Sequence, residues 1–199
     1  MTRAAGRTRA AVLAGLAACG SAATPTPAPG SDPRAATAPP AIPALVLAAA
    51  SEPGVRLTLD GEVVDRAGRP VGDADVHAYQ ADATGAYTPS QPMDEPHARL
   101  AGRVRTDTHG RFAIRTIRPG PYPQAVILDG VPRHIPAHVH VDVTAAGHAE
   151  RRLQVVFADD ASLRDPYWAA WLPAVGQAVT ARPLDGGGGQ GATLTITLP

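Results

Sequence analysis

The sequence contains no lysine and only one cysteine, and aromatic residues make up 4% of its 199 positions. Because Cys19 has no partner in the chain, an intrachain disulfide is excluded even in an oxidising compartment. The eighteen basic residues are all arginines, and eighteen acidic residues balance them, so the formal net charge is zero. Without an excess of positive charge, nucleic acid is not an expected partner.

Signals for long helices and for common catalytic loops are also missing. Twenty glycines and twenty-one prolines predict many turns, and helix is expected only as a short piece within residues 161–174. The glycine run at 185–191 lacks the Lys-Ser/Thr of a phosphate-binding loop and is interpreted as a flexible connection. No motif supports a Ser-His-Asp arrangement. The length fits one domain of ordinary size plus a tail.

The beginning of the sequence is typical of an export signal. Residues 1–18 combine three arginines with an apolar stretch too short to span a bilayer, which predicts a signal peptide. The segment LAAC (16–19) resembles the bacterial lipobox, in which the cysteine is lipidated; a chance cysteine behind a plain cleavage site is the alternative. Cleavage before Cys19 would leave fifteen arginines against eighteen acidic residues. That charge does not favour anionic lipid, so membrane attachment is expected only through a lipid anchor at Cys19.

Residues 19–54 are expected to form the lipidated start and an Ala/Pro-rich spacer, and residues 55–199 the folded domain. From Val55 onward, short alternating or β-branched runs are separated by turn signals. This pattern predicts an all-β fold with little helix, as an antiparallel β-sandwich or a barrel. The protein is expected to be exported, either membrane-anchored or secreted. The expected strands cover residues 57–65, 74–82, 110–117, 137–143, 153–159 and 192–199.

His138 and His140 stand two residues apart in the expected strand 137–143. Side chains at i and i+2 of a strand point to the same side, so two imidazoles about 6 to 7 Å apart at their Cα atoms can reach one metal ion. Val139 and Val141 are then expected to face the core. Two histidines on the solvent face of an edge strand would show the same spacing, so the wider sequence has to decide.

A wider set of motifs supplies that context. It includes GEVVDRAGRPVGDADV (61–76), YQADATGAY (79–87), TDTHGRFAIRTIRPGPYP (106–123), PAHVHV (136–141) and LQVVFADD (153–160). In order and spacing these segments resemble the intradiol ring-cleavage dioxygenases, and TIRPGPYP and PAHVH are the most specific pieces. The resemblance spans nearly the whole expected domain. It implies a β-sandwich of the intradiol dioxygenase catalytic core type.

The resemblance also implies a non-haem Fe(III) centre held by two tyrosinates and two histidines. Carried over onto this sequence, the metal ligands are Tyr87, Tyr122, His138 and His140. The family opens a catechol-type aromatic diol with O2 between its hydroxyl-bearing carbons, which gives a muconate-type product. Tyr122 matches the tyrosine that leaves the metal and accepts a substrate proton, and Gln154 matches a glutamine close to the metal.

One position of the family pattern is not kept. Where the resemblance places a charge-stabilising arginine beside the metal, this sequence has Ile135. Arg133, two residues earlier, and His134 are the candidates to replace it, and Arg133 is therefore expected among the catalytic residues. Loss of such a cation would lower the rate by roughly two orders of magnitude.

Two other functions stay open on the sequence. A non-catalytic cell-surface binding module would keep the sandwich, with or without the metal, and Ile135 favours this interpretation. A zinc-dependent hydrolase would use a carboxylate near the histidines, and Asp142, two residues after His140, is the candidate. A phenol has a pKa of about 10 and binds a metal at neutral pH only if a strong Lewis acid displaces its proton, so the two tyrosines favour ferric iron.

Overall fold

The structure, a computed structural model, describes residues 41–199. The predicted signal peptide 1–18, the predicted lipidation site Cys19 and most of the predicted spacer lie outside the described residues. Within 41–199, the chain folds into two five-stranded sheets and one two-stranded ribbon. None of the described helices is long and apolar enough to cross a membrane.

The first sheet is built on β2 (Arg56–Val64) and β5 (Arg111–Ile117), which pair antiparallel. β2 also pairs in parallel with β12 (Gln190–Thr197), and β5 pairs in parallel with β1 (Ala44–Val46). The strand order is β1-β5-β2-β12-β11, so β11 (Arg182–Pro183) forms one edge.

The second sheet, of order β10-β9-β8-β3-β4, positions the histidine pair. Its central strand, β8 (His138–Thr144), pairs antiparallel with β3 (Asp75–Gln80) and β9 (Arg151–Phe157). β4 (Leu100–Arg105) and β10 (Gly176–Val179) are the edges, and β10 runs parallel to β9. Because β8 has a partner on each side, its backbone is a rigid support for functional side chains.

Alternate residues of both sheets meet in one apolar core. Val139, Val141 and Val143 of β8 are fully buried in it, as are Leu59 of β2 and Ile114 of β5. Successive side chains of a strand point to opposite faces, so the residues between these valines face the outer side of their sheet. The expected alternation in 137–143 is therefore confirmed.

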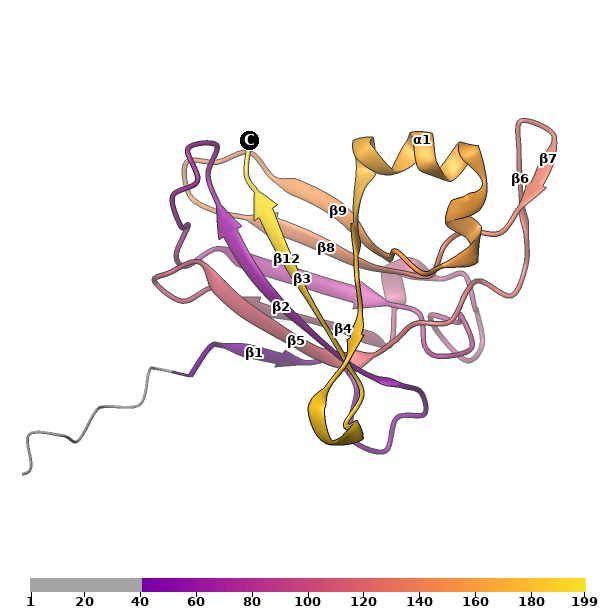
Figure 1. The fold of residues 1–199 in the computed structure, drawn as a ribbon, viewed down its shortest axis with the longest axis horizontal. Coiled ribbons are helices and arrows are strands. Elements are labelled where there is room, and N and C mark those ends of the chain that lie inside the picture. The colour runs from indigo at the N-terminus through magenta and orange to yellow at the C-terminus, as the bar shows by residue number, and fades with distance from the viewer. Residues whose placement is uncertain (1–40) are drawn as a thin grey trace, which may run out of the picture. The chain divides into compact units, whose positions relative to one another are not determined.

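Helix is short in the described part of the chain, as expected. Asp165 caps α1 (Pro166–Val175) by accepting a hydrogen bond at Oδ1 from the Tyr167 amide, 3.0 Å away, and proline fits the first helical turn because no N–H is required there. Figure 1 shows α1 and the β6–β7 ribbon at the same end of the domain. The remaining short elements are β6 (Val126–Leu128), β7 (Val131–Arg133) and the 3-10 turns η1 (Glu95–His97), η2 (Ala161–Arg164) and η3 (Asp185–Gly187).

The all-β sandwich is confirmed, and the predicted start of the domain at residue 55 is corrected. β1 lies inside the range predicted as spacer and pairs with β5, while Ala48 is buried. Leu45 and Leu47 pack against the core, so the apolar run there belongs to the domain. Its alanine-rich composition resembled the preceding spacer, which is why composition alone placed the boundary too late. The three parallel strand pairs were also not expected.

Candidate metal centre

His138 and His140 lie on the outer face of the second sheet, yet both are buried, with 4% and 8% of their surface exposed. Loops cover this part of the sheet, so the alternative of two solvent-facing histidines is wrong. Asp160 helps to fix the start of β8, because its Oδ2 accepts a hydrogen bond from the Ala137 amide at 2.8 Å. The histidine pair is therefore held on a rigid strand in an enclosed site.

Two loops bring Tyr87 and Tyr122 to the same place. Tyr87 follows β3, and Tyr122 follows β5. The loops touch through their backbones: the Gly120 amide donates to the Asp82 carbonyl at 2.9 Å, and a Cβ on Gly85 would lie 2.1 Å from the Pro121 carbonyl oxygen. Gly85 also has a φ of +84°, which favours glycine. The glycine of each loop thus permits the close approach that sets the tyrosines side by side.

The four side chains converge on one point. Tyr87 Oη lies 2.6 Å from Tyr122 Oη and 3.0 Å from His140 Nε2. His138 Nε2 lies 3.0 Å from His140 Nε2 and 3.5 Å from Tyr122 Oη. Donor atoms about 2.0–2.2 Å from a shared metal ion are separated from one another by about 3 Å, so this spacing suits a single cation.

The electrostatics of the cluster keep its groups neutral. Burial raises the pKa of Tyr87 well above its ordinary range, although the hydrogen bond with Tyr122 acts in the opposite direction. Burial also raises the pKa of Tyr122, and the neighbouring Tyr87 and Glu95 raise it further. Burial and the neighbouring His138 lower the pKa of His140 to about 3, and burial lowers the pKa of His138. At neutral pH the phenols are therefore protonated and the imidazoles uncharged.

The donor set fits a strong Lewis acid such as Fe(III). His138 Nδ1 donates to the Pro136 carbonyl at 2.8 Å, so the neutral ring carries its lone pair on Nε2, inside the cluster. Only a highly charged cation displaces two buried phenol protons, and two phenolates then offset most of its charge. Among residues 41–199, no three His, Cys, Asp or Glu side chains form a metal-binding group, so the tyrosines are needed to complete the set.

Asp142 does not join the histidine pair. Its Oδ2 lies 3.8 Å from His77 Nδ1, farther along the outer face of the sheet. The carboxylate that reaches the cluster is instead Glu95 of η1, which accepts a hydrogen bond from Tyr122 Oη at 3.2 Å and lies 3.8 Å from His140 Nε2. The zinc-hydrolase interpretation required Asp142 as a third ligand, and Asp142 is not at the site.

Glu95 and Tyr79 belong to the site and were missed on the sequence. The Tyr79 ring stacks on His140, with ring centroids 4.3 Å apart and planes 4° from parallel. Its position directly opposite His140 in the pairing of β3 and β8 follows from strand register, which the sequence does not specify. Glu95 begins the short 3-10 turn η1 in the connection between β3 and β4, and no motif marks it.

The predicted neighbours of the metal occupy different places. Ile135 packs against the cluster of Tyr87 and Tyr122, in the position where the resemblance expected an arginine. Arg133 instead pairs through Nη1 with Asp165 Oδ2 at the start of α1. Its expected role as the cation beside the metal is therefore not supported by its contacts.

Gln154 and His134 lie close to the site but outside the hydrogen bonds of its four side chains. Gln154 of β9 is directly opposite His140 of β8, so its side chain shares the outer face of the sheet with the histidines. His134 is exposed and lines the neighbouring cavity. The predicted supporting role of Gln154 stays a prediction.

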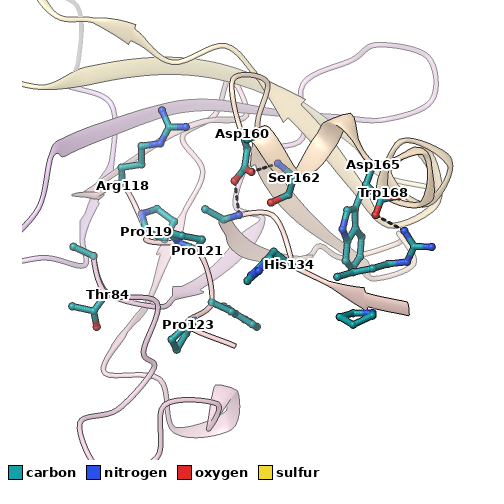
Figure 2. A pocket seen from close by; sticks show the side chains of 16 residues that line it. Thr84, Arg118, Pro119, Pro121, Pro123, His134, Asp160, Ser162, Asp165 and Trp168 are labelled. Carbon is teal, nitrogen blue, oxygen red and sulfur yellow. Dashed lines mark hydrogen bonds and ion pairs between the residues drawn. The ribbon is translucent and has the colours of Figure 1, made fainter. Parts of the chain in front are cut away.

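A cavity of about 1020 Å³ begins beside Tyr122. Figure 2 shows Thr84, Pro121 and Pro123 on one side, Asp165 and Trp168 on the other, and the His134 ring between them. Prolines and Trp168 make much of the wall apolar, while several polar side chains interrupt it, which is typical of a small-molecule site. Because Tyr122 lines the cavity, a molecule within it can reach the cluster of four side chains.

Comparison with known proteins identifies the family. The family model described as Dioxygenase matches residues 34–188, a range that contains all four converging side chains. The chain belongs to the intradiol dioxygenase family. The intradiol match begins well before residue 55, in agreement with the corrected start of the domain.

Curated intradiol relatives match part of their own length. A catechol 1,2-dioxygenase of Acinetobacter baylyi is 32% identical over 123 residues, 57% of this chain and 40% of that protein. The protocatechuate 3,4-dioxygenase beta chain of Burkholderia cepacia is 40% identical over 75 residues, 35% of this chain and 32% of that one. The chain thus spans half or less of the length of these relatives.

Solved intradiol structures share the fold. The dioxygenase domain of a dioxygenase and carbohydrate-binding fusion from the cellulolytic bacterium Streptomyces sp. SirexAA-E has a TM-score of 0.59 and 30% identity, covering 80% of this chain and 90% of that one. The 3-chlorocatechol 1,2-dioxygenase of Rhodococcus opacus has a TM-score of 0.62 and 26% identity, covering 80% and 67%. Intradiol dioxygenases use non-haem iron, which agrees with the donor set described here.

Proposed function

We propose that this protein is a non-haem Fe(III) intradiol dioxygenase that opens a catechol-type diol with O2 to a muconate-type diacid. The observation that carries the proposal is the buried convergence of two phenol oxygens and two imidazole nitrogens beside a cavity. When bound, Fe(III) would supply a Lewis acid that holds both diol oxygens and prepares the ring for attack by O2. Family membership supports the same reaction class.

The residues of the site divide the remaining tasks. His138 and His140 are neutral and rigidly held, so they serve as permanent ligands, and Tyr87, which is 1% exposed, completes this set. Tyr122 lines the cavity, so an incoming diol meets it first. It is the phenol that exchanges a proton with the diol.

Glu95 assists this proton exchange. Its carboxylate accepts the Tyr122 hydrogen bond at 3.2 Å and is partly exposed, so a displaced Tyr122 keeps a polar partner within reach of solvent. The apolar Ile135 packs against the cluster that contains both tyrosines, where a cation would stabilise charge developing on the ring. Slow turnover of plain catechol is therefore expected.

A non-catalytic binding module remains the competing function, and Ile135 is the observation that favours it. Such a protein would keep the sandwich and the metal but would not consume O2. Retention of four donors in a buried cluster favours the enzyme, because burying two unused histidines and two unused phenol groups is unfavourable. Oxygen uptake separates the two functions.

The test is iron reconstitution followed by spectroscopy and oxygen uptake. Tyrosinate bound to Fe(III) absorbs visible light, so the loaded protein should show a broad band between blue and red. Tyr122→Phe should shift and weaken the band, whereas Tyr167→Phe, which alters a tyrosine outside the cluster, should leave it unchanged.

Oxygen uptake with catechol, protocatechuate and hydroxyquinol, with absorbance of the ring-opened product, then measures activity. A colourless protein after iron loading would refute the proposal, and zinc in the purified protein would point to the hydrolase.

We also propose that the protein is exported and anchored through a lipid on Cys19. The charged and apolar pattern of residues 1–18 and the lipobox-like segment support this location. An enzyme placed there would meet phenolic diols outside the cytoplasm, such as those released from plant material.

A further inference from the structure

We infer that Arg133 binds the carboxylate of the substrate, and that the preferred substrate is a catechol whose ring carries a side chain ending in a carboxylate. This inference rests on the proposed function and assigns the cavity beside Tyr122 to the substituent of the diol. Arg133 is thus a specificity-determining residue and not a substitute for the missing cation at the ring.

The size of the cavity indicates a substituted ring. Its volume of about 1020 Å³ lies at the upper end of the range of roughly 300–1,000 Å³ typical of sites for drug-sized ligands. A single-ring diol held at the metal fills a small fraction of that space. The rest extends from Pro121 and Pro123, the neighbours of Tyr122 in the chain, toward Asp165 and Trp168, and these prolines suit a carbon chain.

Arg133 is held in place with one terminal nitrogen of its guanidinium unused. Its Nη1 donates to Asp165, and its Cζ lies 4.6 Å from the centroid of the Tyr167 ring, so both the position and the plane of the group are fixed by the first turn of α1. Within residues 41–199, Nε is buried without a hydrogen-bond partner, and Nη2 has none either. Nε has no accessible surface, so a ligand oxygen in the cavity meets Nη2 instead. A charged N–H donor without a partner forms a strong hydrogen bond with a carboxylate oxygen.

The other charged groups of the cavity are already occupied. Arg118 uses both terminal nitrogens in an ion pair with Asp159, at 3.0 and 2.6 Å, and lies over the Phe157 ring. Asp160 accepts hydrogen bonds from two backbone amides at 2.8 Å, which balance its charge. Asp165 is paired with Arg133 itself. Arg133 is therefore the cavity cation that has a terminal nitrogen to spare.

The place of Arg133 across the cavity predicts where the carboxylate lies on the substrate. Tyr122 lies between Pro121 and Pro123, and Figure 2 shows these prolines on the opposite side of the cavity from Asp165, the partner of Arg133. A carboxylate attached directly to the ring stays close to the four donor side chains and does not cross this space. A carboxylate on a side chain of two or three carbons reaches toward Arg133 through the cavity.

Binding to the iron-loaded full-length protein, measured by calorimetry under nitrogen, tests the inference without turnover. The probes are 3-(3,4-dihydroxyphenyl)propanoate, the neutral 4-ethylcatechol and protocatechuate, whose carboxylate is on the ring. The propanoate should bind roughly tenfold to a hundredfold more tightly than 4-ethylcatechol, with a smaller gain for protocatechuate. Arg133→Met should reduce the propanoate preference to about onefold without changing the affinity for 4-ethylcatechol. Arg103→Met, which removes an arginine paired with Asp75 away from the cavity, is the matched control and should keep the preference.

Several outcomes would overturn the inference. Equal binding of the propanoate and 4-ethylcatechol to the wild-type protein would do so even if the Arg133 variant does not fold, and so would a preference that survives Arg133→Met. A gain for protocatechuate as large as that for the propanoate would overturn the assignment of side-chain length. These results leave the proposed function standing, because that fails instead on a colourless iron-loaded protein or on absent oxygen uptake with all diols.

Discussion

Ile135 is the residue that separates this site from the arginine-containing pattern of the family. It packs against Tyr87 and Tyr122 and offers no charge to the ring of a bound diol. A fixed cation beside developing negative charge stabilises a transition state by about 3 kcal/mol, because it requires no reorganisation during the reaction. The chain instead places its nearby arginine, Arg133, at the far part of the cavity.

Restoring a cation at this position should accelerate turnover of plain catechol. Ile135→Arg should raise kcat for catechol by roughly tenfold to a hundredfold, measured by oxygen uptake at saturating O2. Ile135→Met, which keeps an apolar side chain of similar length to the buried part of arginine, should leave kcat near the wild-type value. An unchanged or lower kcat in the iron-loaded Ile135→Arg protein would show that charge at this position does not limit the reaction.

At the scale of elements, the site depends on two loops that meet over one strand. β8 supplies both histidines, and the loops after β3 and β5 supply the tyrosines. Asp82 orders the first loop: its Oδ1 accepts hydrogen bonds from the Thr84 amide at 2.8 Å and from the Thr84 hydroxyl at 2.7 Å. Burial opposes ionisation of this carboxyl, but these hydrogen bonds outweigh burial, and the pKa of Asp82 is lowered. The charged carboxylate thus stabilises the loop at neutral pH.

A methyl group at the contact between the two loops should separate the tyrosines. Gly85→Ala would place Cβ 2.1 Å from the Pro121 carbonyl oxygen at a φ of +84°, so the loops must move apart. We expect loss of most iron binding and a fall of about 3 kcal/mol or more in the free energy of unfolding. Iron content and denaturant unfolding measure the two effects.

Gly68→Ala provides the matched control for this change. Gly68 has a φ of +76°, but no atom lies within 4 Å of an added Cβ, so only backbone strain of about 1 kcal/mol is expected, with full iron binding. Full iron loading by the Gly85→Ala protein would contradict the dependence of the site on loop contact.

At the scale of the whole molecule, the described domain and the lipobox-like cysteine have separate tasks. The domain holds the metal donors, the cavity and the arginine within it, and the proposed anchor at Cys19 determines where they work. The near balance of charge offers no electrostatic attraction to anionic membranes, so under this proposal the acyl chains would supply the attachment.

Replacing the cysteine should release the protein from the membrane without affecting the chemistry. Cys19→Ser should abolish incorporation of labelled palmitate in bacterial cells and should move the protein from the membrane fraction to the soluble fraction. The visible band of the iron-loaded protein should not change, because the donors lie in the described domain. Palmitate labelling of the Cys19→Ser protein would contradict lipidation at this residue.

The fold class, most strands of the two sheets and the four side chains that converge could be predicted from the amino-acid sequence. Periodicity of two residues reports which face of a strand is buried, and the TIRPGPYP and PAHVH motifs are local enough to be read directly. Features that depend on contacts between distant segments became visible only in the folded domain. These are the pairing of β1 with β5, the contacts of Glu95 and Tyr79 with the cluster, and the position of Asp142 away from it. The position of Arg133 also depends on a distant segment, because its guanidinium pairs with Asp165 at the start of α1. Ile135, and not an arginine, therefore packs against the cluster that contains the tyrosines. Loop paths and strand register are set by packing between segments far apart in the chain, and no local pattern of residues encodes them.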